Sequence, residues 1–242
     1  MAVKEARPEM RCLVVVPTYN ERENISGIIE SIQRHAPAAH VLIIDDNSPD
    51  GTGAVADELR SARPEEIFVL HRPRKEGIGV AYVAGFKFAI AHDYEVVLQM
   101  DADFSHDPKY LPLFLNEIRE HDLVIGSRYL NGISVVNWDL KRLILSKAAT
   151  FYVRFVTRMP LTDTTTGFKC WRREALESIG LERLFSNGYV FLAEMSYRAF
   201  RKKLRITEVP IVFVERSLGR SKMTWGIVAE GLWGVIRMRF RD

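Results

Sequence analysis

Short apolar segments alternate with longer amphipathic segments along the first half of the chain. The apolar, β-branched runs lie at 12–16, 41–44, 67–70, 96–98 and 123–125, and each ends at turn residues. Candidate helices lie between them at about 22–34, 53–62, 78–92 and 108–120. Short continuous apolar runs are typical of buried parallel strands, and their alternation with helices indicates right-handed β-α-β units. The pattern predicts an α/β fold with a mostly parallel sheet that helices cover on both faces.

The second half of the chain has a different pattern. It predicts helices at 139–159, about 189–203 and about 224–240, with a turn-rich loop at 162–167. The segment from Ile206 to Val214 is a predicted strand that Pro210 interrupts. Neither an internal repeat nor a flexible linker separates the halves. We therefore expect a single domain over 1–242 with a C-terminal elaboration.

Composition and charge narrow the class of protein. The 242 residues are 47% hydrophobic and 27% charged, which excludes a wholly disordered chain. The two cysteines, Cys12 and Cys170, cannot build a disulfide framework, so a reducing cytosolic compartment is expected. Residues 1–139 carry a net charge of −8, whereas residues 140–242 carry +11. This asymmetry indicates that the second half faces an anionic partner: nucleic acid, phosphates or a membrane surface.

Polar clusters follow four of the predicted strands. Their sequences are PTYNE at 17–21, DDNSPDGT at 45–52, DAD at 101–103 and GSRY at 126–129. Ligands bind at the carboxyl ends of the strands in open α/β sheets. We therefore expect the four clusters to converge at one edge of the sheet.

The acidic triplet Asp101-Ala102-Asp103 is the candidate for metal chemistry. Two carboxylates that flank one small residue can contact a divalent ion together with a ribose or a phosphate. Mg²⁺ and Mn²⁺ prefer oxygen ligands and commonly keep substrate phosphates among them. An isolated Asp-x-Asp is more often a solvated turn, but this one follows a buried strand and belongs to a series of polar strand ends. The sequence therefore predicts a metal-dependent site.

An ordered series of motifs runs from residue 11 to about 225. The motifs are PTYNERENI, DDNSPDGT, GIGVAYVAGF, MDADFSH, GSRY, WDLKRLILSK, DTTTGFKCWRREAL, GYVFLAEM, EVPIVFVER and GRSK. This set resembles the family 2 glycosyltransferases with the GT-A fold, a Rossmann-like nucleotide-sugar fold. The similarity is greatest to the dolichol-phosphate (polyprenyl-phosphate) mannosyltransferases. It implies transfer of mannose from GDP-mannose to a dolichyl or polyprenyl monophosphate, with Mg²⁺ or Mn²⁺ as cofactor and inversion at the sugar carbon.

The resemblance also implies roles for individual residues. Asp103 would hold the metal, and Ser105 stands where some relatives have a glutamine that also contacts the ion. The catalytic set would be Asp103, Arg128, Lys222 and Asp163. The nucleotide-sugar would contact Pro17, Tyr19, Glu21, Ile44, Asp46, Asp101, Ala102, Asp103, Arg128, Arg216 and Lys222.

The acceptor phosphate would lie against Arg128, Arg142 and Ser146. Asp163, in the turn-rich loop, is the predicted organiser of the acceptor site. A lipid monophosphate has a second pKa of about 6 and is largely dianionic at neutral pH. It therefore needs no general base, unlike an alcohol acceptor, and no histidine is assigned a catalytic role.

Two basic amphipathic helices, 139–160 and 223–242, are predicted to face a membrane. Residues 140–162 contain no acidic residue, and no stretch reaches the roughly 18 apolar residues of a membrane-spanning helix. The expected location is therefore peripheral, on the cytoplasmic face of a membrane: the endoplasmic reticulum in a eukaryote, the plasma membrane in a prokaryote. Whether small membrane subunits assist the enzyme stays open.

Two other functions would account for parts of the sequence. A dolichyl-phosphate glucosyltransferase that uses UDP-glucose shares the fold, but that class usually carries membrane-spanning segments. A basic nucleic-acid-binding protein would account for the positive second half, yet the aromatic and basic motifs of such proteins are not found in the sequence. No nucleic acid partner is expected.

Overall fold

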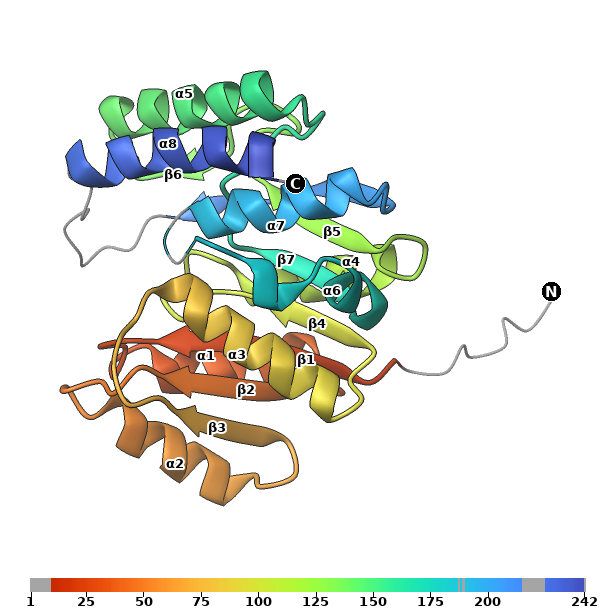
Figure 1. Cartoon of the computed structure of the whole chain (residues 1–242). Helices are drawn as coiled ribbons and strands as arrows, with labels where there is room; N and C mark the ends of the chain where they lie inside the picture. The colour runs from red at the N-terminus through yellow and green to blue at the C-terminus, as the bar shows by residue number, and fades with distance from the viewer. Residues whose placement is uncertain (1–9, 187, 189, 215–224, 242) are drawn as a thin grey trace.

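The computed structural model describes residues 10–186, 188, 190–214 and 225–241. Their strands build a seven-stranded sheet in the order β3-β2-β1-β4-β7-β5-β8 and a two-stranded sheet of β6 and β9 (Figure 1). The strands are β1 (Cys12–Thr18), β2 (His40–Asp45), β3 (Ile67–His71), β4 (Val96–Gln99), β5 (Leu123–Ser127), β6 (Val135–Val136), β7 (Lys169–Arg172), β8 (Ile206–Pro210) and β9 (Phe213–Val214). This architecture confirms the predicted α/β fold with a mostly parallel sheet.

Helices cover both faces of the large sheet. One face packs against α1 (Ile25–His35), α2 (Thr52–Ala62) and α4 (Leu111–Glu117). The other packs against α3 (Ile78–Ala91), α6 (Arg173–Ser178) and α7 (Val190–Arg201). Successive side chains of β1 enter opposite cores, since Val14 and Val15 belong to different clusters. Both faces of the central strands are therefore buried, which explains why they are continuous apolar runs.

Parallel pairing brings the polar strand ends together. Strand β1 lies between β2 and β4, with Thr18 opposite Asp45 and Val15 opposite Gln99. The arrowheads of β1, β2 and β3 point to the same side of the molecule, at the left in Figure 1. The motifs that follow β1, β2 and β4 consequently leave the sheet at one edge, as the sequence predicted.

The sequence did not predict β6, β7 or α6, and of these only β7 lies within the large sheet. Strand β7 is central to that sheet. It runs antiparallel between β4 and β5, with Leu98 opposite Cys170 and Val124 also opposite Cys170. Its sequence, KCWR, is short and neither continuously apolar nor strictly alternating, so no strand signal marks it. The prediction of one strand over 206–214 was also wrong. Two strands occupy this segment, because β8 ends at Pro210 and β9 belongs to the separate small sheet.

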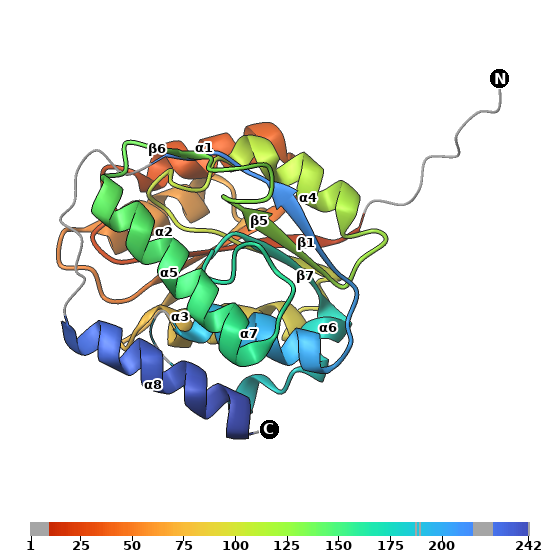
Figure 2. The same cartoon turned by 90° about the horizontal axis from the view of Figure 1, so that it is seen from above.

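Two further helices, α5 (Leu140–Thr157) and α8 (Trp225–Arg241), pack on each other at one end of the sheet (Figures 1 and 2). The Tyr152 hydroxyl donates to the Leu232 carbonyl at 3.0 Å and links them. Asp139 caps the N-terminus of α5, and its carboxylate accepts from the backbone N–H of Arg142 at 2.7 Å. Both helices lie close to the predicted ranges. In the part of the chain that is described, no helix is long and apolar enough to cross a bilayer.

Candidate active site

The acidic motif directly follows β4, and buried polar groups hold it in place. The Tyr82 hydroxyl, which projects from α3, donates to Asp101 Oδ1 at 2.9 Å. The backbone N–H of Asp101 donates to His106 Nδ1 at 3.0 Å. Because these contacts come from both sides of the motif, the direction of the Asp101 carboxylate is determined by the core.

His106 is a neutral structural partner of this motif. Its side chain is buried, and burial lowers the pKa of the imidazole even though the nearby carboxylates of Asp101 and Asp103 oppose that shift. The ring stacks on Phe168 with a centroid separation of 4.9 Å. Since Nδ1 accepts a hydrogen bond, the proton of the neutral ring lies on Nε2.

Ser105 contacts Asp103, the predicted metal ligand. Its hydroxyl donates to Asp103 Oδ1 at 2.5 Å, and its backbone N–H donates to the same oxygen at 3.1 Å. These two donors orient the carboxylate. Whether the Ser105 oxygen also contacts a metal stays a prediction.

The residues of this motif suit a divalent ion that substrate completes. Asp101 and Asp103 present hard oxygen ligands, of the kind that Mg²⁺ and Mn²⁺ prefer. Among the residues that the structure describes, no group of three or more His, Cys, Asp or Glu side chains could hold an ion alone. Substrate phosphates commonly supply further oxygen ligands to Mg²⁺.

Five of the predicted nucleotide-sugar residues, Pro17, Tyr19, Glu21, Ile44 and Asp46, lie at or just after the ends of β1 and β2. Pro17 stands opposite Ile44 in the strand register, and the backbone N–H of Asp46 donates to the Thr18 carbonyl at 3.1 Å. Glu21 lies just before α1, and its backbone N–H donates to Oγ1 of Thr52, the first residue of α2, at 2.9 Å. These contacts join the two polar clusters into one wall.

Two basic residues that the sequence did not single out contact this wall. Arg72 is buried and donates through Nη1 to Asp46 Oδ1 at 2.6 Å. Burial raises the pKa of Asp46, while the charge and hydrogen bond of Arg72 counteract that rise. The Lys75 ammonium lies 3.9 Å from the centroid of the Tyr19 ring. Both contacts join residues far apart in the sequence, so no local pattern marks them.

A buried ion pair joins the end of β5 to the turn-rich loop. Arg128 donates through Nε to Asp163 Oδ2 at 2.6 Å and through Nη2 to Asp163 Oδ1 at 2.8 Å. The Asp163 side chain is fully buried, and that of Arg128 is 8% exposed. Burial alone would raise the pKa of Asp163, but the hydrogen bonds and charge of Arg128 hold it below its usual value. The carboxylate is therefore ionised at neutral pH and acts as a fixed support for Arg128.

The predicted acceptor residues gather around this pair. Arg128 and Arg142 lie over the Trp138 ring, with guanidinium carbons 5.3 and 4.6 Å from its centroid. The Tyr129 hydroxyl donates to Ser146 Oγ at 2.8 Å. The Trp138 indole Nε1 is buried, and within the described part of the chain it has no hydrogen-bond partner. Helix α5 thus brings Arg142 and Ser146 beside the end of β5.

Glu208 anchors the loop that carries Asp163. Its carboxylate on β8 accepts from the Thr162 N–H at 2.8 Å, the Thr162 hydroxyl at 2.9 Å and the Asp163 N–H at 2.9 Å. The sequence placed Glu208 only within a strand-like motif. Its three donors identify it as the residue that determines where the loop lies.

Phe213 connects the acidic motif with the basic cluster, which is formed by Arg128 and Arg142 around Trp138. The centroid of the Phe213 ring lies 5.9 Å from the centroid of the His106 ring and 5.5 Å from the guanidinium carbon of Arg128. A carbon added at Gly167 would lie 3.8 Å from both carboxylate oxygens of Asp101. The predicted metal motif and the predicted acceptor residues therefore share one site. Arg216 and Lys222 lie outside the described residues.

The fold and this site together define a glycosyltransferase. The family model described as "Glycosyl transferase family 2" matches residues 13–180, and the chain belongs to that family. It is 45% identical to the polyprenol monophosphomannose synthase of Mycolicibacterium smegmatis, over 95% of this chain and 89% of that protein. It is also 45% identical to the undecaprenyl-phosphate mannosyltransferase of Micrococcus luteus, over 94% and 93% of the two chains. The resemblance inferred from the motifs is confirmed.

Solved structures share the fold at lower sequence identity. Glucosyl-3-phosphoglycerate synthase from Mycobacterium tuberculosis, in complex with Mn²⁺, UDP and glucosyl-3-phosphoglycerate, superposes with a TM-score of 0.66 at 18% identity. The match covers 95% of this chain and 78% of that chain. The same synthase with phosphoglyceric acid gives a TM-score of 0.66 over 96% and 79%. These likenesses establish the GT-A-like architecture.

Proposed function

We propose that this enzyme transfers mannose from GDP-mannose to a polyprenyl or dolichyl monophosphate. An acceptor phosphate oxygen attacks the anomeric carbon and forms the new C–O bond. The bond from that carbon to the β-phosphate oxygen of GDP-mannose breaks, and GDP leaves with the electron pair. A single displacement inverts the configuration, so the α-linked donor gives polyprenyl phosphate β-mannose.

The basic cluster around Trp138 carries this proposal. Arg128 has five N–H donors, of which Asp163 and Thr165 accept three, through Nε and Nη2. Among the described residues none accepts from Nη1, and the buried Trp138 Nε1 also lacks an acceptor. Unused donors beside a second arginine favour an anionic ligand with several oxygens, as a phosphate monoester is.

The acceptor chemistry removes the need for an enzyme base. Asp163 is bound to Arg128 with a lowered pKa, and His106 uses Nδ1 to accept from the backbone. Neither group is arranged to take up a proton, and a phosphate dianion has none to give. The catalytic demand is instead to stabilise the leaving diphosphate, which cationic side chains do by Coulomb attraction. We assign Arg128 to this task together with Lys222 and Arg216.

The donor end of the site is assigned to the wall formed by β1 and β2. Asp46 and Glu21 offer carboxylates for a nucleoside. Asp101 follows β4, which lies between β1 and β5 in the sheet, so it stands between that wall and the basic cluster around Trp138. A Mg²⁺ or Mn²⁺ held by Asp103 would supply Lewis-acid stabilisation of the diphosphate. The names of the two mannosyl-transferring relatives support mannose as the sugar, and the Mn²⁺ complex of the structural neighbour supports a divalent metal.

A lipid acceptor places the protein on a membrane surface, on its cytoplasmic face. Large apolar side chains are exposed along α5 and α8, among them Ile144, Phe151 and Trp233. Such side chains on basic helices favour shallow insertion at a lipid interface. The protein would act there as one catalytic domain over 1–242.

The experiment compares donors and acceptors with the purified enzyme and metal. GDP-mannose should raise the thermal midpoint and support mannosyl transfer to a polyprenyl monophosphate, whereas UDP-glucose and UDP-GlcNAc should do neither. Stabilisation by UDP-glucose with glucosyl transfer would replace the proposal with the glucosyltransferase alternative. Binding of RNA without any transfer would favour the nucleic-acid alternative.

A further inference from the structure

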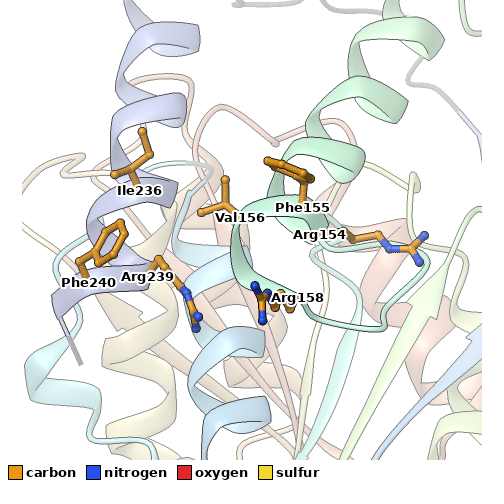
Figure 3. Close-up of a pocket in the computed structure, with 7 residues that line it drawn as sticks. All are labelled: Arg154, Phe155, Val156, Arg158, Ile236, Arg239 and Phe240. Carbon is orange, nitrogen blue, oxygen red and sulfur yellow. The ribbon is translucent and has the colours of Figure 1, made fainter.

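A groove between α5 and α8 lies away from the basic cluster around Trp138. It has a volume of about 700 Å³ and is lined by Arg154, Phe155, Val156, Arg158, Ile236, Arg239 and Phe240 (Figure 3). Arg158 follows Arg142 by 16 positions, which corresponds to about 24 Å along a helix. The groove is therefore distinct from the proposed acceptor site.

Two arginines from different helices meet at this groove. Figure 3 shows Arg158, at the end of α5, and Arg239, on α8, reaching into the same space, whereas Arg154 extends away from α8. Arg239 donates through Nη1 to the Tyr197 hydroxyl at 3.3 Å, which holds its side chain. In the portion of the chain with described coordinates, neither Arg158 nor Arg239 forms an ion pair with a carboxylate. Two cations thus face each other with no described anion between them.

Aromatic side chains accompany these charges. Phe155 is 76% exposed and Phe240 is 82% exposed, each on the same helix as one of the arginines. Val156 and Ile236 also line the groove (Figure 3). A soluble phosphate would use only the guanidinium groups, whereas a lipid would use the exposed rings as well. The combination of cationic and apolar groups favours a molecule with an anionic head and hydrocarbon chains.

We propose that this groove binds the headgroup of an anionic phospholipid in the bilayer. Arg158 and Arg239 bracket the phosphate, and Phe155 and Phe240 enter the acyl-chain region beside it. This site orients the protein on the membrane, so that the basic cluster around Trp138, at the other end of α5, faces the same surface. The inference rests on the proposed membrane location and adds the lipid class that determines it.

The test measures partition of the full chain onto vesicles of phosphatidylcholine with or without phosphatidylglycerol. The double variant Arg158→Gln/Arg239→Gln should weaken binding to the anionic vesicles by more than about 25-fold, since diffuse attraction alone contributes about fivefold for each basic residue near an anionic surface and direct contact with the headgroup adds to it. Arg154→Gln removes the same charge from the same helix, and because its side chain extends away from α8 it should reduce binding by no more than the diffuse contribution of about fivefold. Thermal unfolding confirms that each variant is folded.

Charge-conserving variants separate a headgroup site from diffuse attraction. Arg158→Lys/Arg239→Lys keeps both charges but loses the planar forks, so it should recover only part of the binding. Full recovery, or a loss in Arg154→Gln equal to that of Arg158→Gln or Arg239→Gln alone, would overturn the site. Glycerol phosphate at millimolar concentration should not compete, and strong competition would overturn the bilayer lipid as the occupant. Transfer to a short, water-soluble acceptor should persist in all variants, and its loss in the wild type would count against the proposed function instead.

Discussion

At the residue scale, the site depends on buried polar pairs more than on single exposed groups. Tyr82 supports Asp101, Ser105 supports Asp103, and Asp163 supports Arg128. Each support removes rotamer freedom from a group that is expected to touch substrate. A charge developing on the diphosphate therefore meets side chains that are already oriented, which is the condition for strong electrostatic stabilisation.

Replacing Asp103 by asparagine tests the metal assignment. The change keeps the size of the side chain and removes the charge that would hold the ion. We expect the rate of mannosyl transfer to fall by at least about 100-fold, as with loss of a main electrostatic stabiliser. Thermal unfolding should be unchanged. Near-normal turnover at saturating metal would contradict the assignment.

The pH profile tests whether the enzyme supplies a base. The rate should rise with pH through the second pKa of the acceptor phosphate, about 6, and then stay flat. Its midpoint should move when an acceptor analogue with a different phosphate pKa is used. A midpoint that ignores the acceptor and disappears in Asp163→Asn or His106→Ala would show that one of these residues acts as a base.

Lys169 makes the stability of the protein depend on pH. Its ammonium is fully buried against the Leu192 carbonyl and the Ser196 hydroxyl. Burial lowers its pKa from 10.5 to about 7, although the charge of Asp163 opposes the shift. Between these two values the unfolded chain holds a proton that the folded protein has released. The free energy of unfolding therefore rises with pH across that window, by up to about 1.4 kcal/mol per pH unit.

Denaturant titrations of the wild type and of Lys169→Met would measure this contribution. The stability of the wild type relative to the variant should increase between pH 7 and about 10 and should level off below pH 7. Lys87→Met, at an exposed position of α3, is the matched control and should leave the pH dependence unchanged. A constant difference between wild type and Lys169→Met would contradict the buried, titrating lysine.

At the element scale, α5 has two ends with different tasks. Its first turns carry Arg142 and Ser146 to the basic cluster, while its last turn reaches the groove with α8. The helix is held between these ends by Val153, which lies in the core, and by the Tyr152 contact to α8. The direction of one helix therefore determines both where the acceptor residues lie and which surface is apolar.

Removal of the Asp139 cap should affect both stability and acceptor binding. Asp139→Ala leaves the Arg142 N–H without its acceptor, at a cost of about 1 kcal/mol in the free energy of unfolding. The first turn of α5 then loosens, so KM for the acceptor should rise while KM for the donor changes little. Asp139→Asn retains a good cap and should resemble the wild type. Equal changes in both KM values would argue against a local effect.

At the scale of the whole molecule, the two halves of the chain differ in charge. The first 139 residues carry −8 and the rest carry +11, although the complete chain is only +3. Helices α5 and α8 lie at the β5–β8 end of the sheet, and α2 lies at the β3 end (Figure 1). The basic helices therefore gather at one end of the molecule, which is the end that we propose faces an anionic surface.

This separation of charge predicts that the salt dependence of mannosyl transfer differs between acceptors. Raising the salt concentration from about 50 mM to about 500 mM shortens the range of charge interactions to a few ångströms. Transfer to a long-chain acceptor in anionic vesicles should fall at least about fivefold. Transfer to a short, water-soluble acceptor should change much less. An equal loss with both acceptors would place the salt effect in the active site rather than at the membrane.

Much of the fold could be predicted from local sequence patterns. The strands of the first half are short apolar runs, and their polar ends meet because parallel strands share one direction. Strand β7 could not be predicted in this way, since its pairing with β4 and β5 is what makes KCWR a strand. The motifs identified the candidate residues of the site but not the contacts that orient them.

The sequence alone therefore determined the class of fold and the family, and it supplied the residues that we predict for the metal and acceptor sites. Local periodicity and motif order carry that information, because each depends only on neighbouring positions. The tertiary structure decided which side chains pair. Arg72 contacts Asp46, Asp163 contacts Arg128, and Glu208 contacts the loop that carries Asp163. These pairs join segments 26 to 45 residues apart. Only the packing of the sheet brings them within hydrogen-bond distance, and burial then makes each contact strong enough to hold the site.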